Sequence, residues 1–413
     1  MADQNHSHSP FTERTPLDEA RAQLDERVEP HGRTEAVPLE AADGRVVAAT
    51  LESPGNVPHY RRAAMDGYAV RAEDTFGASD RSPAVLRNVA ENGQRESGDL
   101  DRREARQVHT GSALPEGADA VVMVEHTSAV GDEIEVSQAV GEGENVAPVG
   151  EDVAAGQHLY DPGHRLRPSD LGLLKSVGMT EVTVYERPTV SVIPTGEELV
   201  QSDPGPGEVI ETNGLTVSRL ARRWGGEPTY NEVVTDDRER LAAAIRDSLD
   251  HDIVVTTGGS SVGARDLLPE VVAGLGEVFV HGVGIKPGHP VALGVVEGTP
   301  VLMLPGYPVS CLINAVQFLR PAIAWAGGAA PEPFPAVTAR LEEKIYSEPG
   351  LRSFARVQLD GQDGELVATA VRASGAGVLS SVALSDGWVV VPENSEGLDA
   401  GDTVEVQRWE WSP

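Results

Sequence analysis

The sequence predicts a multidomain α/β protein: a three-layer α/β domain with a parallel-rich sheet, an all-β module, a small mixed α+β domain and a C-terminal β-barrel-like domain. Three observations support this prediction. The chain has 413 residues, so several domains of roughly 50–200 residues each are expected. Strand-like and helix-like segments alternate within residues 188–330, as in a parallel sheet with crossover helices. Short β-prone runs with Gly, Asn and Asp turns fill residues 45–150 and return after a proline-rich linker at 331–335.

The first regular element expected is an amphipathic helix that begins near Pro16. Acidic residues occupy its first turn, and apolar residues recur along it at helical spacing: Leu17, Ala20, Leu24 and Val28. A second helix is expected from Ser169 to Val177. We expect residues 16–44 to pack with residues 151–187 as one discontinuous mixed α+β domain, which leaves residues 45–150 as the β module.

Residues 188–330 are expected to form the α/β domain. Predicted strands and helices follow one another through this region: Thr189–Pro194, a helix after Asn213, Tyr230–Val234, a helix over Arg238–Leu249, Asp252–Thr256, Glu277–Val283 and a helix after Pro308. Residues 331–413 are expected to form the barrel-like domain, because short strands alternate there with Gly and Asp turns.

The composition excludes several classes of partner. The chain has 33 Lys and Arg against 65 Asp and Glu, a formal net charge of −32, which argues against binding to nucleic acid or to an anionic membrane. The first 15 residues are polar and no run of about 18 apolar residues occurs, so neither a signal peptide nor a membrane helix is predicted. A single cysteine, Cys311, cannot form an intrachain disulfide. We therefore expect a cytoplasmic protein.

One glycine-rich loop follows a buried strand. The strand Asp252–Thr256 runs into Thr257-Gly258-Gly259-Ser260-Ser261-Val262-Gly263, where glycines allow close backbone approach to a phosphate and hydroxyls add donors. The alternative is a plain strand-to-helix turn, which glycines also serve. Asp266 favours the anion site, because a carboxylate beside a bound phosphate needs a bridging hard cation such as Mg²⁺.

Two further loops are candidates for the same pocket. Pro305-Gly306-Tyr307-Pro308-Val309-Ser310 follows the strand Val301–Leu304, with Pro308 suited to the first helical turn and Ser310 to a cap or an anion contact. Lys286 lies in a Pro/Gly loop between the two. Since the chain contains only three lysines, a required point charge is indicated there, although a solvent-facing lysine is the simpler alternative.

Three other carboxylates stand where predicted strands end or turns begin: Asp66, Glu198 and Asp236. In so acidic a protein an Asp or Glu usually lies on a solvated surface. Position at the carboxyl ends of parallel strands raises Glu198 and Asp236 above that default, because ligands bind at this edge of an open sheet.

Several motifs, in this order and spacing, resemble the molybdopterin molybdenumtransferase family, whose members include MoeA and the gephyrin E-domain. The resemblance spans roughly residues 16–410 and rests on these motifs: Met65-Asp66-Gly67-Tyr68-Ala69-Val70, His109-Thr110-Gly111, Gly150-Glu151-Asp152, Pro194-Thr195-Gly196-Glu197-Glu198-Leu199, the loop through Asp266, Lys286-Pro287-Gly288 and Pro305-Gly306-Tyr307-Pro308-Val309-Ser310. It implies a homodimer of four-domain subunits in which the α/β domain of one chain binds molybdopterin and faces the β module of the other.

The resemblance also implies a reaction: molybdate is inserted into adenylylated molybdopterin, and AMP is released with the help of Mg²⁺. The implied catalytic residues are Asp66 and Thr110, contributed by the partner chain, with Glu198, Asp236, Asp266 and Lys286. Glu198, Asp236 and Asp266 would hold the metal. The expected binding residues are Thr195, Gly196, Gly258, Gly259, Ser260, Ser261, Gly263, Pro305, Gly306, Pro308 and Ser310, with Arg352, Arg356 and Ser381 as candidates for the oxyanion.

The sequence departs from the family pattern where cations are expected. His289 stands where the resemblance leads one to expect a second lysine, and histidine makes the charge pH-dependent. Nothing in the loops distinguishes molybdate from tungstate. Two other functions are weighed: an adenylyltransferase, which would not need the β module or the last domain, and a non-catalytic scaffold, which would not need four carboxylates at strand ends.

The acidic surface predicts that stability rises with salt. Only Lys175, Lys286 and Lys344 are lysines, and the excess carboxylates repel one another at low ionic strength, whereas salt screens them. We expect the melting temperature to be higher in molar KCl than in dilute buffer. Equal melting temperatures in the two solutions, measured by circular dichroism, would contradict the prediction.

Overall fold

The computed structural model describes residues 14–89, 99–259, 267–362, 364–371 and 377–410. The chain divides into two compact units. One consists of the chain up to Glu35, Gly44–Val46 and the chain from Tyr185 onward, and the other of Ala36–Asp43 and Val47–Val184. Each unit is described by itself.

The second unit contains a small mixed α+β region. Its strands pair in twos, β1 (Thr34–Pro38) with β12 (Glu181–Tyr185) and β2 (Leu51–Glu52) with β11 (His158–Tyr160). The short helix η1 (Leu39–Ala41) and the helix α2 (Pro168–Ser176) complete it. Apolar side chains from all these parts share one core, among them Val37, Leu39, Val47, Leu166, Leu174 and Val184.

The β module, in the same unit, is built on a six-stranded sheet. Its order is β7 (Ala120–Met123), β4 (Gly67–Val70), β6 (Glu104–Val108), β5 (Ala84–Asn88), β9 (Glu133–Val136) and β8 (Thr127–Val130). Among the described strand pairs of this sheet, only β5 and β6 run parallel. β3 (Arg62–Ala63) pairs with β10 (Val146–Ala147), and the short helices η2 (Ala72–Thr75) and η3 (Val124–His126) connect strands. The all-β prediction is confirmed.

The first unit contains the α/β domain, whose sheet has six strands. Their order is β16 (Glu227–Tyr230), β13 (Thr189–Pro194), β17 (Ile253–Thr257), β21 (Thr299–Leu304), β20 (Ala292–Val296) and β18 (Glu277–His281). The first four strands pair in parallel, and β20 pairs antiparallel with both of its neighbours, β21 and β18. A parallel pair of two-residue strands, β14 (Leu199–Val200) and β15 (Val209–Ile210), follows β13.

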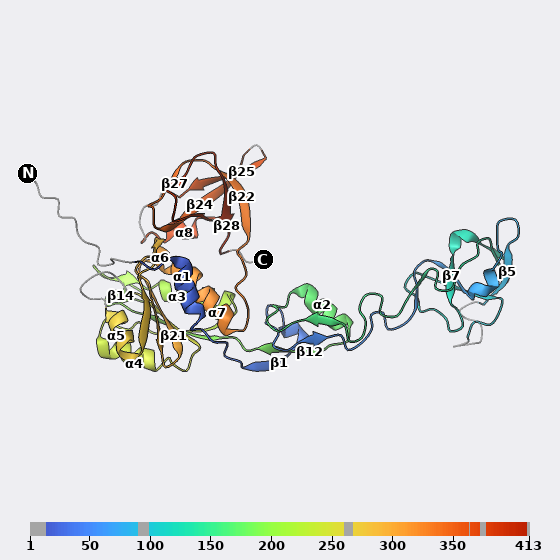
Figure 1. Cartoon of the computed structure of the whole chain (residues 1–413), viewed down its shortest axis with the longest axis horizontal. Helices are drawn as coiled ribbons and strands as arrows, with labels where there is room; N and C mark the ends of the chain where they lie inside the picture. The colour runs from blue at the N-terminus through green and yellow to red at the C-terminus, as the bar shows by residue number, and fades with distance from the viewer. Residues whose placement is uncertain (1–13, 90–98, 260–266, 363, 372–376, 411–413) are drawn as a thin grey trace, which may run out of the picture. The chain divides into compact units, whose positions relative to one another are not determined.

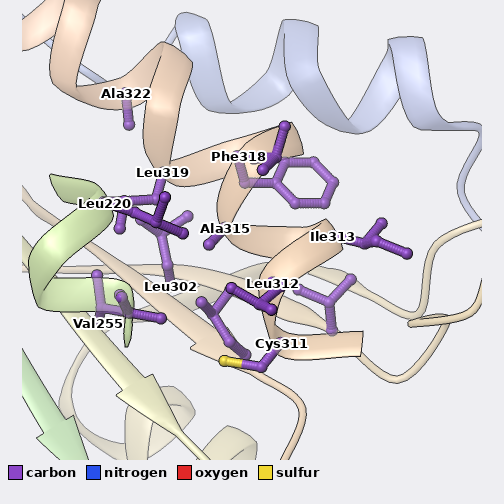
Figure 2. Close-up of a cluster of buried hydrophobic side chains, with 14 of the residues drawn as sticks. Leu220, Val255, Leu302, Cys311, Leu312, Ile313, Ala315, Phe318, Leu319 and Ala322 are labelled. Carbon is purple, nitrogen blue, oxygen red and sulfur yellow. The ribbon is translucent and has the colours of Figure 1, made fainter. Parts of the chain in front are cut away.

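Helices cover both faces of this sheet, which confirms the three-layer prediction (Figure 1). The helices α4 (Arg238–Arg246) and α5 (Leu267–Leu275) pack on one face. The helix α3 (Asn213–Arg223) and a long helix made of α6 (Pro308–Asn314), the π-helical turn η4 (Ala315–Leu319) and α7 (Arg320–Ala326) pack on the other. Figure 2 shows Val255 and Leu302 of the sheet in one cluster with Leu220, Leu312 and Leu319 of these helices.

The long helix, Pro308–Ala326, has 19 residues and an apolar composition. Among the described residues it alone is long and apolar enough to cross a bilayer, but 89% of its apolar window is buried inside the protein. Such burial is typical of the central helix of a packed domain.

The N-terminal helix α1 (Leu17–Asp25) packs differently from the prediction. Its apolar residues Leu17, Ala20 and Leu24 join the core formed by the sheet of the α/β domain and the long helix, not the core of residues 151–187. The domain predicted from residues 16–44 and 151–187 is therefore wrong in this part. Amphipathic spacing shows that a helix has an apolar face, but it does not show which core receives that face.

The C-terminal region is a closed barrel, as predicted. Its strands are β24 (Arg352–Gln362), β25 (Glu365–Ala370), β22 (Ala336–Leu341), β28 (Thr403–Gln407) and β26 (Gly387–Val391), and β26 pairs back with β24 to close the ring. β19 (Ile285–Lys286) extends the sheet from the α/β domain by pairing with β24. β23 (Ile345–Tyr346) pairs with β27 (Gly397–Leu398), and α8 (Ser380–Ala383) is a single helical turn.

Candidate functional site

Three parallel strands of the α/β domain, β13, β17 and β21, end at one edge of the sheet, and two glycines follow β17. The Gly258 N–H donates to the carbonyl of Leu304, at the end of β21, over 3.0 Å. Gly258 has φ +123°, and a Cβ on it would stand 2.2 Å from the carbonyl oxygen of Thr195. Only glycine fits between the two neighbouring strand ends. The loop backbone is therefore locked into the sheet edge where ligands of such folds bind.

Buried threonine hydroxyls lie behind this loop. Thr195, Thr256 and Thr257 are each 1% exposed, and none of their hydroxyls has a hydrogen-bond partner in the part of the chain that the structure describes. A Cβ on Gly259 would stand 3.2 Å from Oγ1 of Thr195. Thr195 is predicted to bind the ligand. In the structure its buried hydroxyl lies close to Gly259 of the loop. Four other predicted residues lie outside the described residues: Ser260, Ser261, Gly263 and Asp266.

The structure brings two of the predicted metal ligands onto adjacent segments. The Gly196 N–H donates to the carbonyl of Val234 over 3.2 Å, so the chain after β13 runs beside the chain that leads to Asp236. Glu198 is exposed, and its carboxylate oxygens lie 2.9 Å from where a Cβ on Gly196 would stand. No group of three metal-binding side chains occurs among the described residues, and Asp266, the third predicted ligand, lies outside them.

The loop after β21 meets the first glycine loop. A Cβ on Gly306 would stand 3.4 Å from the Cα of Gly258. Pro305 is buried, and Pro308 starts the long helix as predicted. Ser310 is 3% exposed and lies inside that helix, and the helix has no side-chain cap. Ser310 therefore serves packing and not capping.

Two residues at the start of α3 hold this arrangement, and sequence analysis missed both. Asn213 donates from Nδ2 to the carbonyl of Gly306 over 2.7 Å. The carboxylate of Glu211, which is 5% exposed, accepts from the Gly214 N–H over 2.6 Å and from the hydroxyl of Tyr230. Burial, and then the hydrogen bond to Glu211, raise the pKa of Tyr230. An acidic residue just before a helix and an asparagine at its first position were the available signal.

Lys286 stands in a loop of the same unit. Its ammonium lies 3.7 Å from a carboxylate oxygen of Glu348, and both side chains are more than half exposed. Such a pair is weak and leaves Lys286 able to attract an anion. Burial, and then the charge of Arg14, lower the pKa of His289. His289 is therefore mostly neutral at pH 7, so it does not replace the positive charge of a second lysine.

The other predicted cations and Ser381 have contacts of their own. The guanidinium of Arg352 makes two 2.8 Å bonds to Asp18 and two 2.9 Å bonds to Glu393, and these bonds raise the pKa of Arg352. Burial lowers the pKa of Arg356. The Ser381 hydroxyl donates to the carbonyl of Val378 over 2.7 Å. The structure does not support Arg352 as an oxyanion ligand, because two carboxylates already occupy its donors.

In the β module, Asp66 and Thr110 lie together. One carboxylate oxygen of Asp66 accepts from the Thr110 N–H over 2.6 Å and from its hydroxyl over 2.9 Å. These two bonds lower the pKa of Asp66, which keeps the carboxylate ionised at neutral pH. Gly67 is required next to it, because a Cβ there would stand 1.9 Å from the carbonyl oxygen of Val122.

Comparison with known proteins covers nearly the whole chain. Three family models match: the MoeA N-terminal region (domain I and II) over residues 15–178, the probable molybdopterin binding domain over 191–325, and the MoeA C-terminal region (domain IV) over 338–409. Molybdopterin molybdenumtransferase 2 of Mycobacterium tuberculosis is 35% identical over 386 residues, 90% of this chain and 94% of that protein. The chain belongs to the molybdopterin molybdenumtransferase family.

Other members of the molybdopterin molybdenumtransferase family agree with this assignment. The enzyme of that name from Bacillus subtilis is 31% identical over 417 residues, 96% of each chain. Two solved structures of a MoeA protein from Pyrococcus horikoshii are 36% and 32% identical, with TM-scores of 0.82 and 0.81. Each covers 96% of this chain, and this chain covers 99% and 100% of theirs.

The glycine at 258 provides a test of the site geometry. In Gly258→Ala the new Cβ overlaps the Thr195 carbonyl and the positive φ is strained, so we expect a loss of stability of roughly 2 kcal/mol or more. The matched control is Gly274→Ala in α5, where nothing lies within 4 Å of the added Cβ and helix propensity favours alanine. Denaturant unfolding measures both. A Gly258→Ala protein as stable as the wild type would contradict the geometry.

Proposed function

We propose that the protein is a molybdopterin molybdenumtransferase of molybdenum cofactor biosynthesis. It would take adenylylated molybdopterin and molybdate, insert the metal at the dithiolene, and release AMP. The observation that carries the proposal is the interlocked sheet edge formed by Thr195, Gly258 and Gly306, in a chain that aligns with transferases of this name over nearly its full length. The matches to the N-terminal and C-terminal regions favour insertion over adenylylation, which would not need these modules.

The sheet edge with Gly258 and Gly306 is suited to binding the phosphates of the adenylate. Glycine backbone can approach an anion closely, and the N–H groups of such loops are donors. The long helix begins at Pro308, directly after the Gly306 loop, and the N-terminal end of a helix carries partial positive charge. The chain can therefore bind a phosphate group here although its net charge is −32.

A divalent cation fits the carboxylates at this edge. Glu198 and Asp236 lie on neighbouring segments after β13 and β16, and carboxylate oxygens are the ligands that Mg²⁺ prefers. With Asp266 they would hold the ion. When bound, it would neutralise charge on the adenylate phosphate as AMP leaves.

The dianion molybdate requires positive charge, which this chain supplies sparingly. Lys286 is an exposed cation that could bind molybdate. The guanidinium of Arg352 is held by Asp18 and Glu393 instead. We assign to Asp66 and Thr110 a role at the site of a second copy of the chain. Their paired, exposed polar groups would then complete the site within a homodimer.

Release of AMP tests the function. Protein in molar KCl receives adenylylated molybdopterin, molybdate and Mg²⁺, and AMP is measured by chromatography. We expect AMP only when molybdate and Mg²⁺ are both present, and a rate lowered roughly tenfold or more in Glu198→Gln because a metal ligand is lost. Glu197→Gln removes a neighbouring exposed carboxylate and should keep the rate. No AMP above a metal-free control would rule the function out.

Mixed dimers test the shared site. Asp66→Asn and Glu198→Gln, each nearly inactive alone, are coexpressed so that subunits mix. If Asp66 acts on the partner's α/β domain, half of the dimers carry one intact site, and about a quarter of wild-type activity returns. If both residues act within one chain, no site is intact and activity stays at the level of the single variants.

A further inference from the structure

The loop that presents Lys286 is fixed at two of its sides. At its base the Val283 N–H donates to the carbonyl of His289 over 3.0 Å. On the barrel side Ile285 and Lys286 pair with Arg352 and Ser353 of β24. These contacts leave the turn at Gly288, between Lys286 and His289, to be fixed by something else.

Asn314, at the end of α6, makes that third attachment. It is fully buried, and its Nδ2 donates to the carbonyl of Gly288 over 2.9 Å and to the carbonyl of Ser310, one helical turn earlier, over 2.8 Å. Both hydrogens of the amide are thus used. The hydrogen bond to Ser310 fixes the rotamer of Asn314. The hydrogen bond to Gly288 joins the loop of Lys286 to the helix.

The two partners are matched in shape. Gly288 has φ +115°, and a Cβ on it would stand 2.4 Å from Nδ2 of Asn314. Any other residue at 288 would push the loop off the helix. The glycine is therefore required for the close approach that the hydrogen bond needs.

Packing alone does not explain an asparagine at position 314. Its Oδ1 is buried and has no hydrogen-bond partner among the residues that the structure describes. A buried acceptor without a partner costs free energy, and an apolar residue of similar shape would avoid that cost. Ile313, Ala315 and Val316 beside it are apolar core residues. The amide is thus explained by the loop that it holds.

We propose that Asn314 is a positioning residue for oxyanion binding: it ties the loop of Lys286 to the helix that starts at the Gly306 loop. The proposal rests on the proposed function, since it takes molybdate as the ion that Lys286 attracts. The buried amide of Asn314 would then set the distance between Lys286, which attracts the oxyanion, and the sheet edge with Gly258 and Gly306, which binds the adenylate.

The test compares Asn314→Leu with a matched control on the same helix. Gln317→Leu also removes a buried amide, 3% exposed, but this one contacts Arg21 of α1 and not the lysine loop. AMP release is measured against molybdate concentration. We expect Asn314→Leu to raise the half-saturating molybdate concentration roughly tenfold or more, with a much smaller change in kcat, because a displaced charge weakens binding. Gln317→Leu should keep the wild-type value.

A double variant and hydrogen exchange separate positioning from stability. In a Lys286→Met background, Asn314→Leu should add no further loss, because the two residues act through one contact. Amide exchange in the peptide 283–289 should accelerate in Asn314→Leu and not in Gln317→Leu. This readout does not depend on activity, so it judges the attachment even if the wild type releases no AMP, which would refute the proposed function separately. Unchanged molybdate dependence, an equal rise in Gln317→Leu, additive losses or unchanged exchange would each overturn the proposal.

Discussion

The burial of one helix, Pro308–Ala326, is the constraint on which the first unit depends. Its apolar residues fill the core between the sheet, α3 and α1 (Figure 2), and each fully buried Leu, Ile or Phe contributes roughly 1.5–3 kcal/mol. The polar groups that this helix carries are placed by the same packing. Its first residue follows the Gly306 loop, Asn314 holds the loop of Lys286, and Gln317 accepts hydrogen bonds from Arg21. A core helix therefore also aligns the candidate site.

Some charged side chains of this protein are used in contacts that hold the fold together, and others remain available to a ligand. The ion-pair cluster of Arg352 with Asp18 and Glu393 joins the barrel to α1, and its arginine is partly shielded from solvent. Because that arginine is occupied, oxyanion binding would rest on Lys286, backbone donors and the helix terminus. His289, with its lowered pKa, adds little charge at neutral pH. An acidic enzyme can thus bind anionic substrates by local groups while its overall field repels them.

Much of the fold was predictable because the spacing of apolar residues along the chain indicates which side chains are buried. The alternation within residues 188–330 indicated the three-layer domain, and the short strands after residue 331 indicated a barrel. The partner of an element was less predictable: α1 has a clear apolar face, but nothing local shows that this face packs against the long helix. Strand limits also moved, since Tyr230 ends a strand that was expected to begin there.

Gly258, Gly306, Glu198 and Asp236 were predicted from glycines or from position at strand ends, and the structure places them beside the ends of the parallel strands; their binding roles stay predictions. The site was missed where a single amide acts through a distant backbone carbonyl, as for Asn213 and Asn314, because one polar residue in a helix gives no signal of its contact. For Arg352 the sequence shows a charge but not the carboxylates of Asp18 and Glu393 that occupy its donors, so its role toward the oxyanion stays a prediction that these contacts do not favour.

A crystal structure with AMP and Mg²⁺ bound tests whether the edge where β13, β17 and β21 end holds the adenylate. We expect phosphate density against Gly258 and Gly306 and a metal ion between it and Glu198 or Asp236. Density for the nucleotide elsewhere, such as in the 690 Å³ cavity lined by Arg21, Trp325 and Phe354, would contradict this placement of the adenylate.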